Sequence, residues 1–581
     1  MNILLTAINA KYIHSNLAVY SLRACAGEYR DTVELAEYTI NNQKDYILEE
    51  LYKRKPDVLC FSCYIWNIDY VTDIAREYKK LCPSVPIWVG GPEVSYEVEA
   101  FLRENPYIDG VMIGEGEDTF RELCGYYAHK RKLSDIAGIA FRKNSTAGKA
   151  DEIVFTSPRP IKNMSEIPFC YDTLDDFSNR IIYYESSRGC PFSCSYCLSS
   201  VDKTLRFRDT EIVKRELKFF IDQKVPQIKF VDRTFNCNHA HAMELWRFIK
   251  ANDNGVTNFH FEISADLLNQ EELELISDMR PGLIQLEIGV QSTNEVTIKE
   301  IHRTMKLERL KEVVKLIQSG NNIHEHLDLI AGLPYEDYDS FGRSFDEIYE
   351  LKPNQLQLGF LKVLKGSYMF EHAAEYGIVY HDKPPYEVMS TKWLSFDDVI
   401  KIKRVEDMLE VYYNSGQFEI TMKLMECIFD SAFEFFQELG DFYEANGYFG
   451  MSHSRIRRCE ILLEFMALYL HGCDSDDTDF DENAQLYNMI QESLIFDLYY
   501  RENCKSRPRW ATDIGSFKHM THAYCKNGKL SHVEPFHYIF PDKHTRKLDE
   551  LPKYHKEPVW ALFHYDMRDP LDHQAMVEYI E

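Results

Sequence analysis

The sequence predicts an α/β protein with a doubly wound parallel sheet at the N-terminal end, a central partial (β/α)6 barrel and a mainly helical C-terminal domain. Three observations support this fold class. Short apolar runs alternate with amphipathic helical patterns over residues 1–145, and the same alternation returns over residues 176–370. It then stops, and helical patterns rich in Tyr and Phe follow over residues 371–581. Alternating strands and helices are typical of parallel sheets covered by helices.

Length and composition limit the class of protein. The 581 residues, 45% of them hydrophobic, are enough for several domains that each bury a core. The net charge of −27 argues against nucleic acid, because phosphate backbones are bound by clustered Lys and Arg. Fifteen scattered cysteines fit a reducing, cytoplasmic environment better than a disulfide framework. No signal peptide or membrane span is expected, and the oligomeric state is not indicated.

Residues 1–145 are expected to form a Rossmann-like domain. Its expected strands are Ile3–Ile8, Val33–Tyr38, Asp57–Ser62, Pro86–Val89 and Gly110–Ile113. Ligands bind such sheets beyond the carboxyl ends of the strands, at the topological switch point. Polar residues and glycines follow these ends, as at Ser62, Gly90–Gly91 and Gly114–Glu115. Paired glycines let the backbone approach a bulky ligand closely.

Residues 146–175 lose periodicity and are expected to be a linker. Residues 176–370 then carry six strand-like runs, which are Ile181–Ser186, Gln227–Asp232, Asn258–Ser264, Leu283–Gly289, His324–Ile330 and Gln355–Phe360. Helical patterns separate these runs. Six strand–helix repeats suggest an incomplete barrel, with chemistry at the carboxyl ends of its strands.

Three cysteines follow the first of these strands with the spacing C-x3-C-x2-C, namely Cys190, Cys194 and Cys197. Thiolates are the usual ligands of iron–sulfur clusters. Three of them can hold a [4Fe-4S] cubane and leave one iron open to a small molecule. Zinc and simple buried thiols are the alternatives, although no nearby residue completes a four-ligand zinc site.

The cysteine spacing, with Tyr196 before the last Cys, resembles the signature of the radical SAM enzymes, which cleave S-adenosylmethionine reductively. The resemblance implies cofactor contacts at successive strand ends. Glu262 and Gln291 would hold the ribose, and Arg303 would pair with the methionine carboxylate. Asp328 would sit beside the nucleoside, and Tyr196 would border the adenine.

One part of the family pattern is missing. Asp232 and Arg233 end the second strand, where the family carries the Gly-Gly-Glu segment that meets the methionine amino group. If the resemblance holds there, these two residues take over that contact.

The first domain resembles the cobalamin-binding domain. Ser62 and Gly90–Gly91 match its serine and double-glycine elements, and Gly114 and Glu115 lie in a run that looks like the version placed before radical SAM domains. The family's D-x-H-x-x-G motif is not intact, because only His14 matches it. Two interpretations with cobalamin are open: cobalamin binds without a protein ligand to cobalt, or His14 ligates the cobalt from a divergent loop. For His14 itself, we favour the interpretation that it is a loop histidine with no special role.

Together these resemblances imply a radical SAM enzyme with a [4Fe-4S] cluster, S-adenosylmethionine and cobalamin. It would methylate an unactivated carbon of a small-molecule substrate and receive electrons from a flavodoxin or ferredoxin. Two alternatives stay open. One is an oxidative cyclase, rearrangement or methylthiotransferase-like enzyme without functional cobalamin, and the other is an iron–sulfur electron-transfer or sensor protein. The C-terminal region resembles an uncharacterised family appended to such proteins, so it adds no substrate information.

Overall fold

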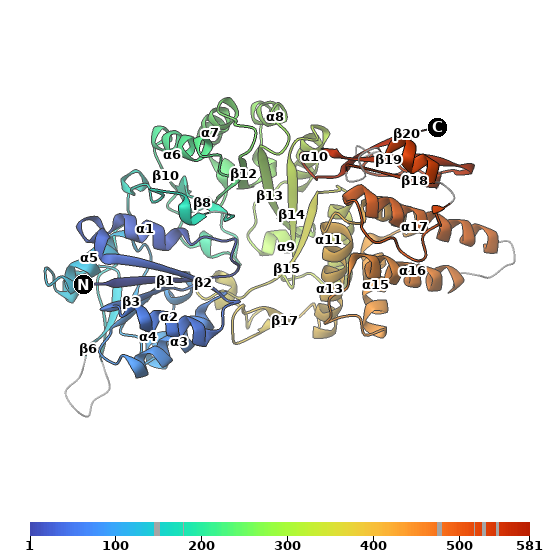
Figure 1. The fold of residues 1–581 in the computed structure, drawn as a ribbon. Coiled ribbons are helices and arrows are strands. Elements are labelled where there is room, and N and C mark those ends of the chain that lie inside the picture. The colour runs from blue at the N-terminus through green and yellow to red at the C-terminus, as the bar shows by residue number, and fades with distance from the viewer. Residues whose placement is uncertain are drawn as a thin grey trace.

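The computed structural model describes residues 1–143, 152–177, 179–472, 479–515, 518–525, 530–541 and 545–580. Three regions follow one another across the molecule, with the N-terminal sheet at one end, the barrel in the middle and a helical region at the other end (Figure 1). The predicted α/β fold class is confirmed.

The N-terminal sheet has the strand order β2-β1-β3-β4-β5-β6-β7. The strands are β1 Ile3–Asn9, β2 Val33–Thr39, β3 Val58–Ser62, β4 Ile87–Gly90, β5 Gly110–Met112, β6 Ile139–Lys143 and β7 Glu152–Phe155. Strands β1 to β5 pair in parallel, and β6 and β7 extend the sheet in antiparallel fashion. Because β1 lies between β2 and β3, the strand order reverses there and creates the switch point expected for a ligand site.

Helices cover both faces of this sheet. They are α1 Leu17–Cys25, α2 Lys44–Arg54, α3 Ile68–Leu81, α4 Val98–Glu104 and α5 Glu117–Tyr127. The buried side chains of α1 and α5 belong to one core, and those of α2, α3 and α4 belong to another. The sheet is therefore doubly wound, as the strand and helix pattern predicts.

The expected linker differs from the structure. Residues 146–151 lie outside the described residues, but Glu152–Phe155 form β7 and pair with β6. The two end residues of this four-residue strand are exposed and the two middle ones only partly buried, so it has too few buried apolar residues to stand out as a strand in the sequence. The sheet thus continues past residue 145, where the sequence suggests that the domain ends.

The barrel sheet has six parallel strands in the order β15-β14-β13-β12-β11-β8. They are β8 Ile182–Tyr184, β11 Gln227–Phe230, β12 Asn258–Ile263, β13 Ile284–Gln291, β14 His324–Ala331 and β15 Gln355–Phe360. The helices of this region are α6 Thr210–Asp222, α7 His239–Ala251, α8 Gln270–Ser277, α9 Glu295–Glu300, α10 Leu307–Ser319 and α11 Tyr338–Tyr349. A small ladder of β9 (Ser187–Arg188) and β10 (Arg206–Phe207) closes the loop that carries the three cysteines.

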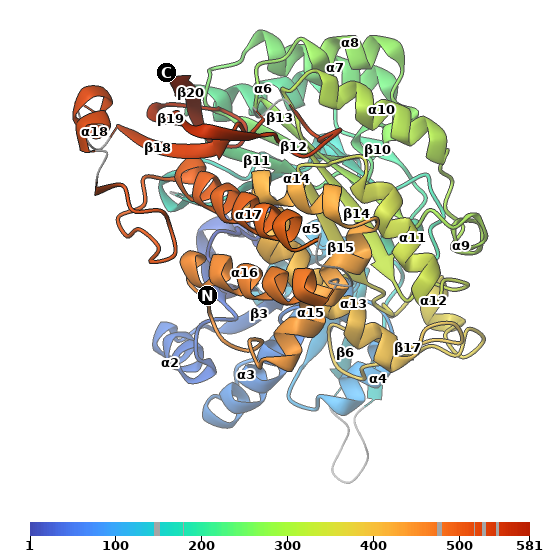
Figure 2. The ribbon, with the colours of Figure 1, turned by 90° about the vertical axis from the view of Figure 1, so that its right-hand side faces the viewer.

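The C-terminal region is mainly helical and packs against the barrel on the side of β15 (Figure 2). Its helices and strands are α12 Tyr368–Glu371, β16 Val379–Tyr380, β17 Val388–Ser390, α13 Phe396–Leu409, α14 Glu419–Ile428, α15 Ala432–Ala445, α16 Arg455–Gly472, α17 Asp479–Arg501, α18 Lys518–Tyr524, β18 Ser531–Tyr538, β19 Tyr554–Arg568 and β20 Ala575–Ile580. The last three strands form an antiparallel sheet.

One helical pattern of this region is divided in the structure. Apolar periodicity predicts a single helix over residues 418–439, but α14 ends at Ile428 and α15 begins at Ala432. Asp346 of α11 accepts hydrogen bonds from Ser431 Oγ (2.7 Å) and from the backbone N–H of Phe433 (2.9 Å). This contact from a distant element caps α15 at its N-terminus and fixes the break. In the parts of the chain that the model covers, no helix combines the length and apolar character of a membrane span.

Candidate active site

A cavity of about 1180 Å³ lies between the strand ends of the N-terminal sheet and those of the barrel. It brings together predicted residues from both domains. These are His14, Ser62, Gly90, Gly91, Gly114, Tyr196, Cys197, Arg233, Glu262, Gln291 and Asp328. The two sets of carboxyl ends therefore face one another, as expected for two ligand-binding sheets.

The cysteine loop leaves the barrel after β9 and is held by backbone bonds from distant segments. Ser195 N–H donates to the Ile301 carbonyl, and Met369 N–H donates to the Ser195 carbonyl, each at 2.9 Å. At Gly189, where φ is +91°, a Cβ would lie 2.5 Å from the Thr204 carbonyl oxygen. The tight turn into Cys190 therefore requires glycine.

The three thiols lie near one another in this loop. Cys190 and Cys194 are buried, and Cys197 is half-buried. Burial raises the pKa of the Cys190 thiol, and the neighbouring Cys197 and Cys194 add to the rise. Among the described residues, no group of three or more His, Cys, Asp or Glu side chains is already arranged around a metal position. The residue type of the three thiols and their place in one loop suit an iron–sulfur cluster.

A further cysteine approaches this group. Cys237 follows β11, and burial raises its pKa to about 11, with Cys190 as the next contributor. It lies forty residues beyond the C-x3-C-x2-C motif, so spacing in the sequence gives no sign of it.

Arg303 joins the cysteine loop to the end of β13. Its Nη1 lies 3.2 Å from the Tyr196 hydroxyl and 3.8 Å from Cys194 Sγ, and its Nη2 donates to the Gly289 carbonyl. Arg303 Nε and Gln291 Oε1 are buried and have no hydrogen-bond partner among the described residues. Such groups are usually satisfied by a ligand or water. A carboxylate beside the guanidinium would satisfy the first of them.

A β-bulge aims Gln291 into this site. The pairing of β13 with β14 shifts register between Gly289 and Gln291, and Gln291 has φ = +78°. A positive φ in a residue with a side chain is strained and is often found at functional sites. The strand would otherwise alternate regularly, so the bulge re-aims this one side chain.

The carboxyl groups of Glu262 and Asp328 face the cavity from β12 and β14. Burial raises the pKa of both, and the neighbouring Glu287 adds to each rise. Asp328 Oδ1 lies 3.2 Å from His326 Nε2. Carboxyl groups of raised pKa suit contacts with the hydroxyls of a ribose better than contacts with a cation.

Asp232 does not reach the cavity. It is fully buried and accepts hydrogen bonds from Ser186 N (2.9 Å), Ser186 Oγ (2.7 Å) and Ser187 Oγ (2.5 Å). This geometry differs from the expected contact with a methionine amino group. Asp232 instead fixes the segment that leads into the cysteine loop, and only its neighbour Arg233 lies on the cavity wall.

The glycines of the N-terminal domain shape the opposite wall. At Gly91, with φ = +120°, a Cβ would lie 2.4 Å from the Cys63 carbonyl oxygen, whereas at Gly114, with φ = +73°, a Cβ would meet nothing within 4 Å. Glu115 lies away from the cavity and forms ion pairs with Arg188 (3.4 Å) and Arg206 (2.5 Å). The backbone at Gly114 thus borders free space that a large ligand can fill.

His14 lies where the two domains meet. Its Nδ1 is 2.7 Å from the Tyr183 hydroxyl of β8, and burial lowers its pKa. One ring nitrogen of His14 is therefore engaged by the barrel, and the side chain still lines the cavity.

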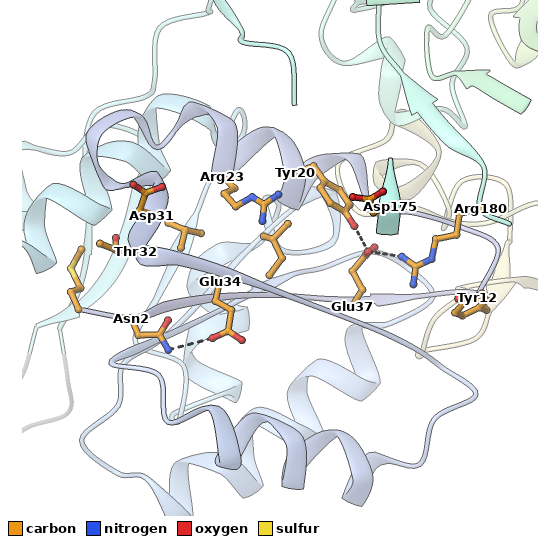
Figure 3. A pocket seen from close by; sticks show the side chains of 13 residues that line it. Asn2, Tyr12, Tyr20, Arg23, Asp31, Thr32, Glu34, Glu37, Asp175 and Arg180 are labelled. Carbon is orange, nitrogen blue, oxygen red and sulfur yellow. Dashed lines mark hydrogen bonds and ion pairs between the residues drawn. The ribbon is translucent and has the colours of Figure 1, made fainter. Parts of the chain in front are cut away.

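Glu37 connects this wall to the barrel. It accepts hydrogen bonds from Tyr20, Asn9 (2.9 Å) and Asn16 N–H (3.1 Å), and it pairs with Arg180 at 2.6 Å. Figure 3 shows Tyr20, Glu37 and Arg180 beside a second cavity of about 970 Å³ at the edge of the sheet. Asn16 Nδ2 also donates to Ser62 Oγ at 3.1 Å. The polar loop Asn9–Asn16 thus ties Ser62 to the domain contact.

We expect Gly91→Ala to lower the free energy of unfolding by about 1–3 kcal/mol, since both its positive φ and the Cys63 carbonyl oppose a side chain. The variant should also bind hydroxocobalamin more weakly, because the loop that carries Gly91 must shift. Gly255→Ala is the matched control, with φ = +76° and nothing within 4 Å of its Cβ. Chemical denaturation measures the free energy of unfolding, and absorbance titration measures hydroxocobalamin binding. Equal losses of stability and binding in the Gly91 and Gly255 variants would contradict a role for the close contact between Gly91 and the Cys63 carbonyl.

The domains resemble known families. Residues 3–124 match the model of the B12 binding domain, residues 184–348 match that of the radical SAM superfamily, and residues 374–576 match a protein family of unknown function, DUF4080. The chain therefore combines a B12 binding domain, a radical SAM domain and a DUF4080 domain.

Individual curated proteins and solved structures are similar to parts of this chain. The cobalamin-dependent radical SAM methyltransferase TokK of Streptomyces tokunonensis is 28% identical over 354 residues, which are 56% of this chain and 49% of TokK. The 2-(S-pantetheinyl)-carbapenam-3-carboxylate methyltransferase of Streptantibioticus cattleyicolor is 28% identical over 51% of this chain and 45% of its own length. The chain thus spans about half the length of these relatives. The structure of OxsB, a cobalamin-dependent S-adenosylmethionine radical enzyme, matches with a TM-score of 0.59 and 16% identity, and covers 86% of this chain and 80% of OxsB.

Proposed function

We propose that this protein is a cobalamin-dependent radical SAM enzyme that methylates an unactivated carbon of a small-molecule substrate. The observation that carries the proposal is the buried Arg303, which contacts the cysteine loop and the end of β13 beside an unsatisfied Gln291. When bound, a [4Fe-4S] cluster supplies the electron that splits S-adenosylmethionine, and cobalamin carries the methyl group that is transferred.

In this proposal the residues of the chain bind the cofactors, orient them and shield them from solvent. Cys190, Cys194 and Cys197 hold the cluster, and Arg303 pairs with the methionine carboxylate. Glu262, Gln291 and Asp328 contact the nucleoside, with Tyr196 at the adenine. The loops at Ser62, Gly90–Gly91 and Gly114 support cobalamin on the facing wall.

The proposed exchange balances in atoms and electrons. One molecule of S-adenosylmethionine gives up its methyl group and leaves as S-adenosylhomocysteine. A second ends as methionine and 5′-deoxyadenosine, which carries the hydrogen atom lost by the substrate. Two electrons enter for each methyl group transferred. A flavodoxin or ferredoxin is the class of reductant that suits this step, and a cytoplasmic location fits that partner.

The test is anaerobic reconstitution of the full chain with iron, sulfide and hydroxocobalamin, followed by reduction in the presence of S-adenosylmethionine. We expect 5′-deoxyadenosine to form and a corrinoid absorbance band to stay with the protein after gel filtration. Protein that retains its cluster but forms no 5′-deoxyadenosine would contradict the enzyme assignment. Formation of 5′-deoxyadenosine without retained corrinoid would instead favour a radical enzyme that does not use cobalamin.

A further inference from the structure

One face of the barrel sheet carries two rows of polar side chains, and four of them, Tyr183, Lys229, Glu262 and Glu287, line the cavity. In one row of paired residues across neighbouring strands stand Tyr183, Lys229, His260, Gln285 and His324. In the next row stand Glu262, Glu287, His326 and Gln355. Residues in register on neighbouring strands share one face of a sheet. Barrel interiors are normally filled by bulky branched apolar side chains, so these two rows depart from the common pattern.

An ion pair lies at the centre of these rows. Lys229 Nζ is 2.8 Å from Glu287 Oε2, and His260 Nε2 is 2.9 Å from the same oxygen. Burial alone would raise the pKa of Glu287, but the hydrogen bond from His260 and the charge of Lys229 outweigh it and hold the pKa well below its usual range. Glu287 is therefore ionised, and Lys229 is its cationic partner.

This ion pair faces the cavity rather than the protein core. Lys229 and Glu287 both line the cavity, and their side chains retain 25% and 22% of their exposure. Burying two charges costs several kcal/mol per ion before their attraction offsets it. If this ion pair only stabilised the fold, there would be no reason for it to lie on the cavity wall, where a bound ligand would displace its water.

The proposed reaction gives this pair no acid–base task. The substrate exchanges a hydrogen atom for a methyl group, and neither transfer requires a protein base. Binding is the remaining role for Lys229 and Glu287. An apolar substrate against them would strip their water and return no hydrogen bond, which leaves buried polar groups unsatisfied.

The pairing of opposite charges in Lys229 and Glu287 narrows the class of substrate further. The Lys229 ammonium donates hydrogen bonds and the Glu287 carboxylate accepts them. The two side chains therefore match a group that has a hydrogen-bond acceptor and a donor side by side, such as a zwitterion or adjacent hydroxyls.

We propose that Lys229 and Glu287 form the substrate-binding floor of the cavity, and that the substrate is a polar small molecule rather than a hydrocarbon lipid. This inference rests on the proposed methyl transfer. The floor is distinct from the residues assigned to S-adenosylmethionine and cobalamin, so its loss should leave the binding of both intact.

The experiment uses the reconstituted full chain with S-adenosylmethionine that carries a deuterated methyl group. A small-molecule extract of the source cells is divided by solvent partition into an aqueous and a lipid fraction, and each is incubated with the enzyme. Mass spectrometry follows the labelled methyl group, and the rate of 5′-deoxyadenosine formation is measured in parallel. The variants are Lys229→Met and Glu287→Gln, and Lys250→Met, which removes a surface pair with Asp278, is the matched control.

We expect label in the aqueous fraction, and faster 5′-deoxyadenosine formation when that fraction is added. In both floor variants the labelled product should fall at least tenfold, while S-adenosylmethionine binding and cleavage without substrate persist. A labelled product in the lipid fraction, or one that forms equally well in the floor variants, would overturn the inference but keep the proposed function. If no extract component gains the labelled methyl group although 5′-deoxyadenosine still forms, the proposed methyl transfer is contradicted, and the inference that rests on it is contradicted as well.

Discussion

Replacing Cys197 by Ala should abolish 5′-deoxyadenosine formation, whereas the same change at Cys237 should preserve it. Cys190, Cys194 and Cys197 share one loop and provide three thiolates, and an open iron is needed to bind S-adenosylmethionine. With two loop thiols left, the cluster loses a ligand and the protein loses both iron and activity. Iron content, the absorption of the cluster and product formation after reduction measure this effect.

Cys237 makes this experiment decisive. It lies outside the loop, and the nearby Cys190 thiol helps to raise its pKa. If it completed the cluster, Cys237→Ala would lower the iron content as Cys197→Ala does, and S-adenosylmethionine would not change the spectrum of the reduced wild type. These two results together would show that the protein is an electron-transfer or sensor protein and not a radical SAM enzyme.

Arg303→Lys should weaken S-adenosylmethionine binding by about 2–4 kcal/mol, or ~30- to ~1000-fold in Kd. The guanidinium contacts Tyr196, Cys194 and the Gly289 carbonyl at the same time, and it retains an unsatisfied Nε. The single ammonium of lysine cannot reproduce this planar set of donors. The change in the spectrum of the reduced cluster on titration with S-adenosylmethionine measures the Kd.

Arg309→Lys is the control for the Arg303 variant, because Arg309 of α10 does not line the cavity and pairs with Glu312 at 3.2 Å. Its Kd should equal that of the wild type. Iron content in both variants separates a loss of ligand binding from a loss of the cluster. An unchanged Kd in Arg303→Lys with a full cluster would exclude the proposed carboxylate contact.

Local patterns predicted much of the fold and of the site. The cysteine motif lies within eight residues, and Glu262, Gln291 and Asp328 lie at strand ends that periodicity locates closely. Because parallel strands end at one edge, residues far apart in the chain could be assigned to one cavity. The structure brings these three side chains to that cavity.

What escaped prediction depends on contacts between distant segments. Asp232 turns inward because Ser186 and Ser187 supply hydrogen bonds from a segment that lies 46 and 45 residues earlier. Glu37 and Arg180 are 143 residues apart, and neither belongs to a motif. The polar floor did leave a signal, since polar residues alternate with apolar ones along β12, β13 and β14. That alternation indicates a face that is not packed by apolar side chains.

The contact between the segment around residues 366–386 and the loop that follows Gly90–Gly91 has a consequence for biosynthesis. The Tyr386 hydroxyl donates to Glu93, and Gly366 packs against the ring of Tyr96, so segments almost three hundred residues apart meet beside the cavity. A chain emerging from the ribosome can fold its N-terminal sheet early, but that sheet alone forms only one wall of the cavity and leaves the site open to solvent. The walls of the cavity include residues as late as Leu364, so a ligand that needs both walls has to be loaded after the chain has grown past the barrel strands.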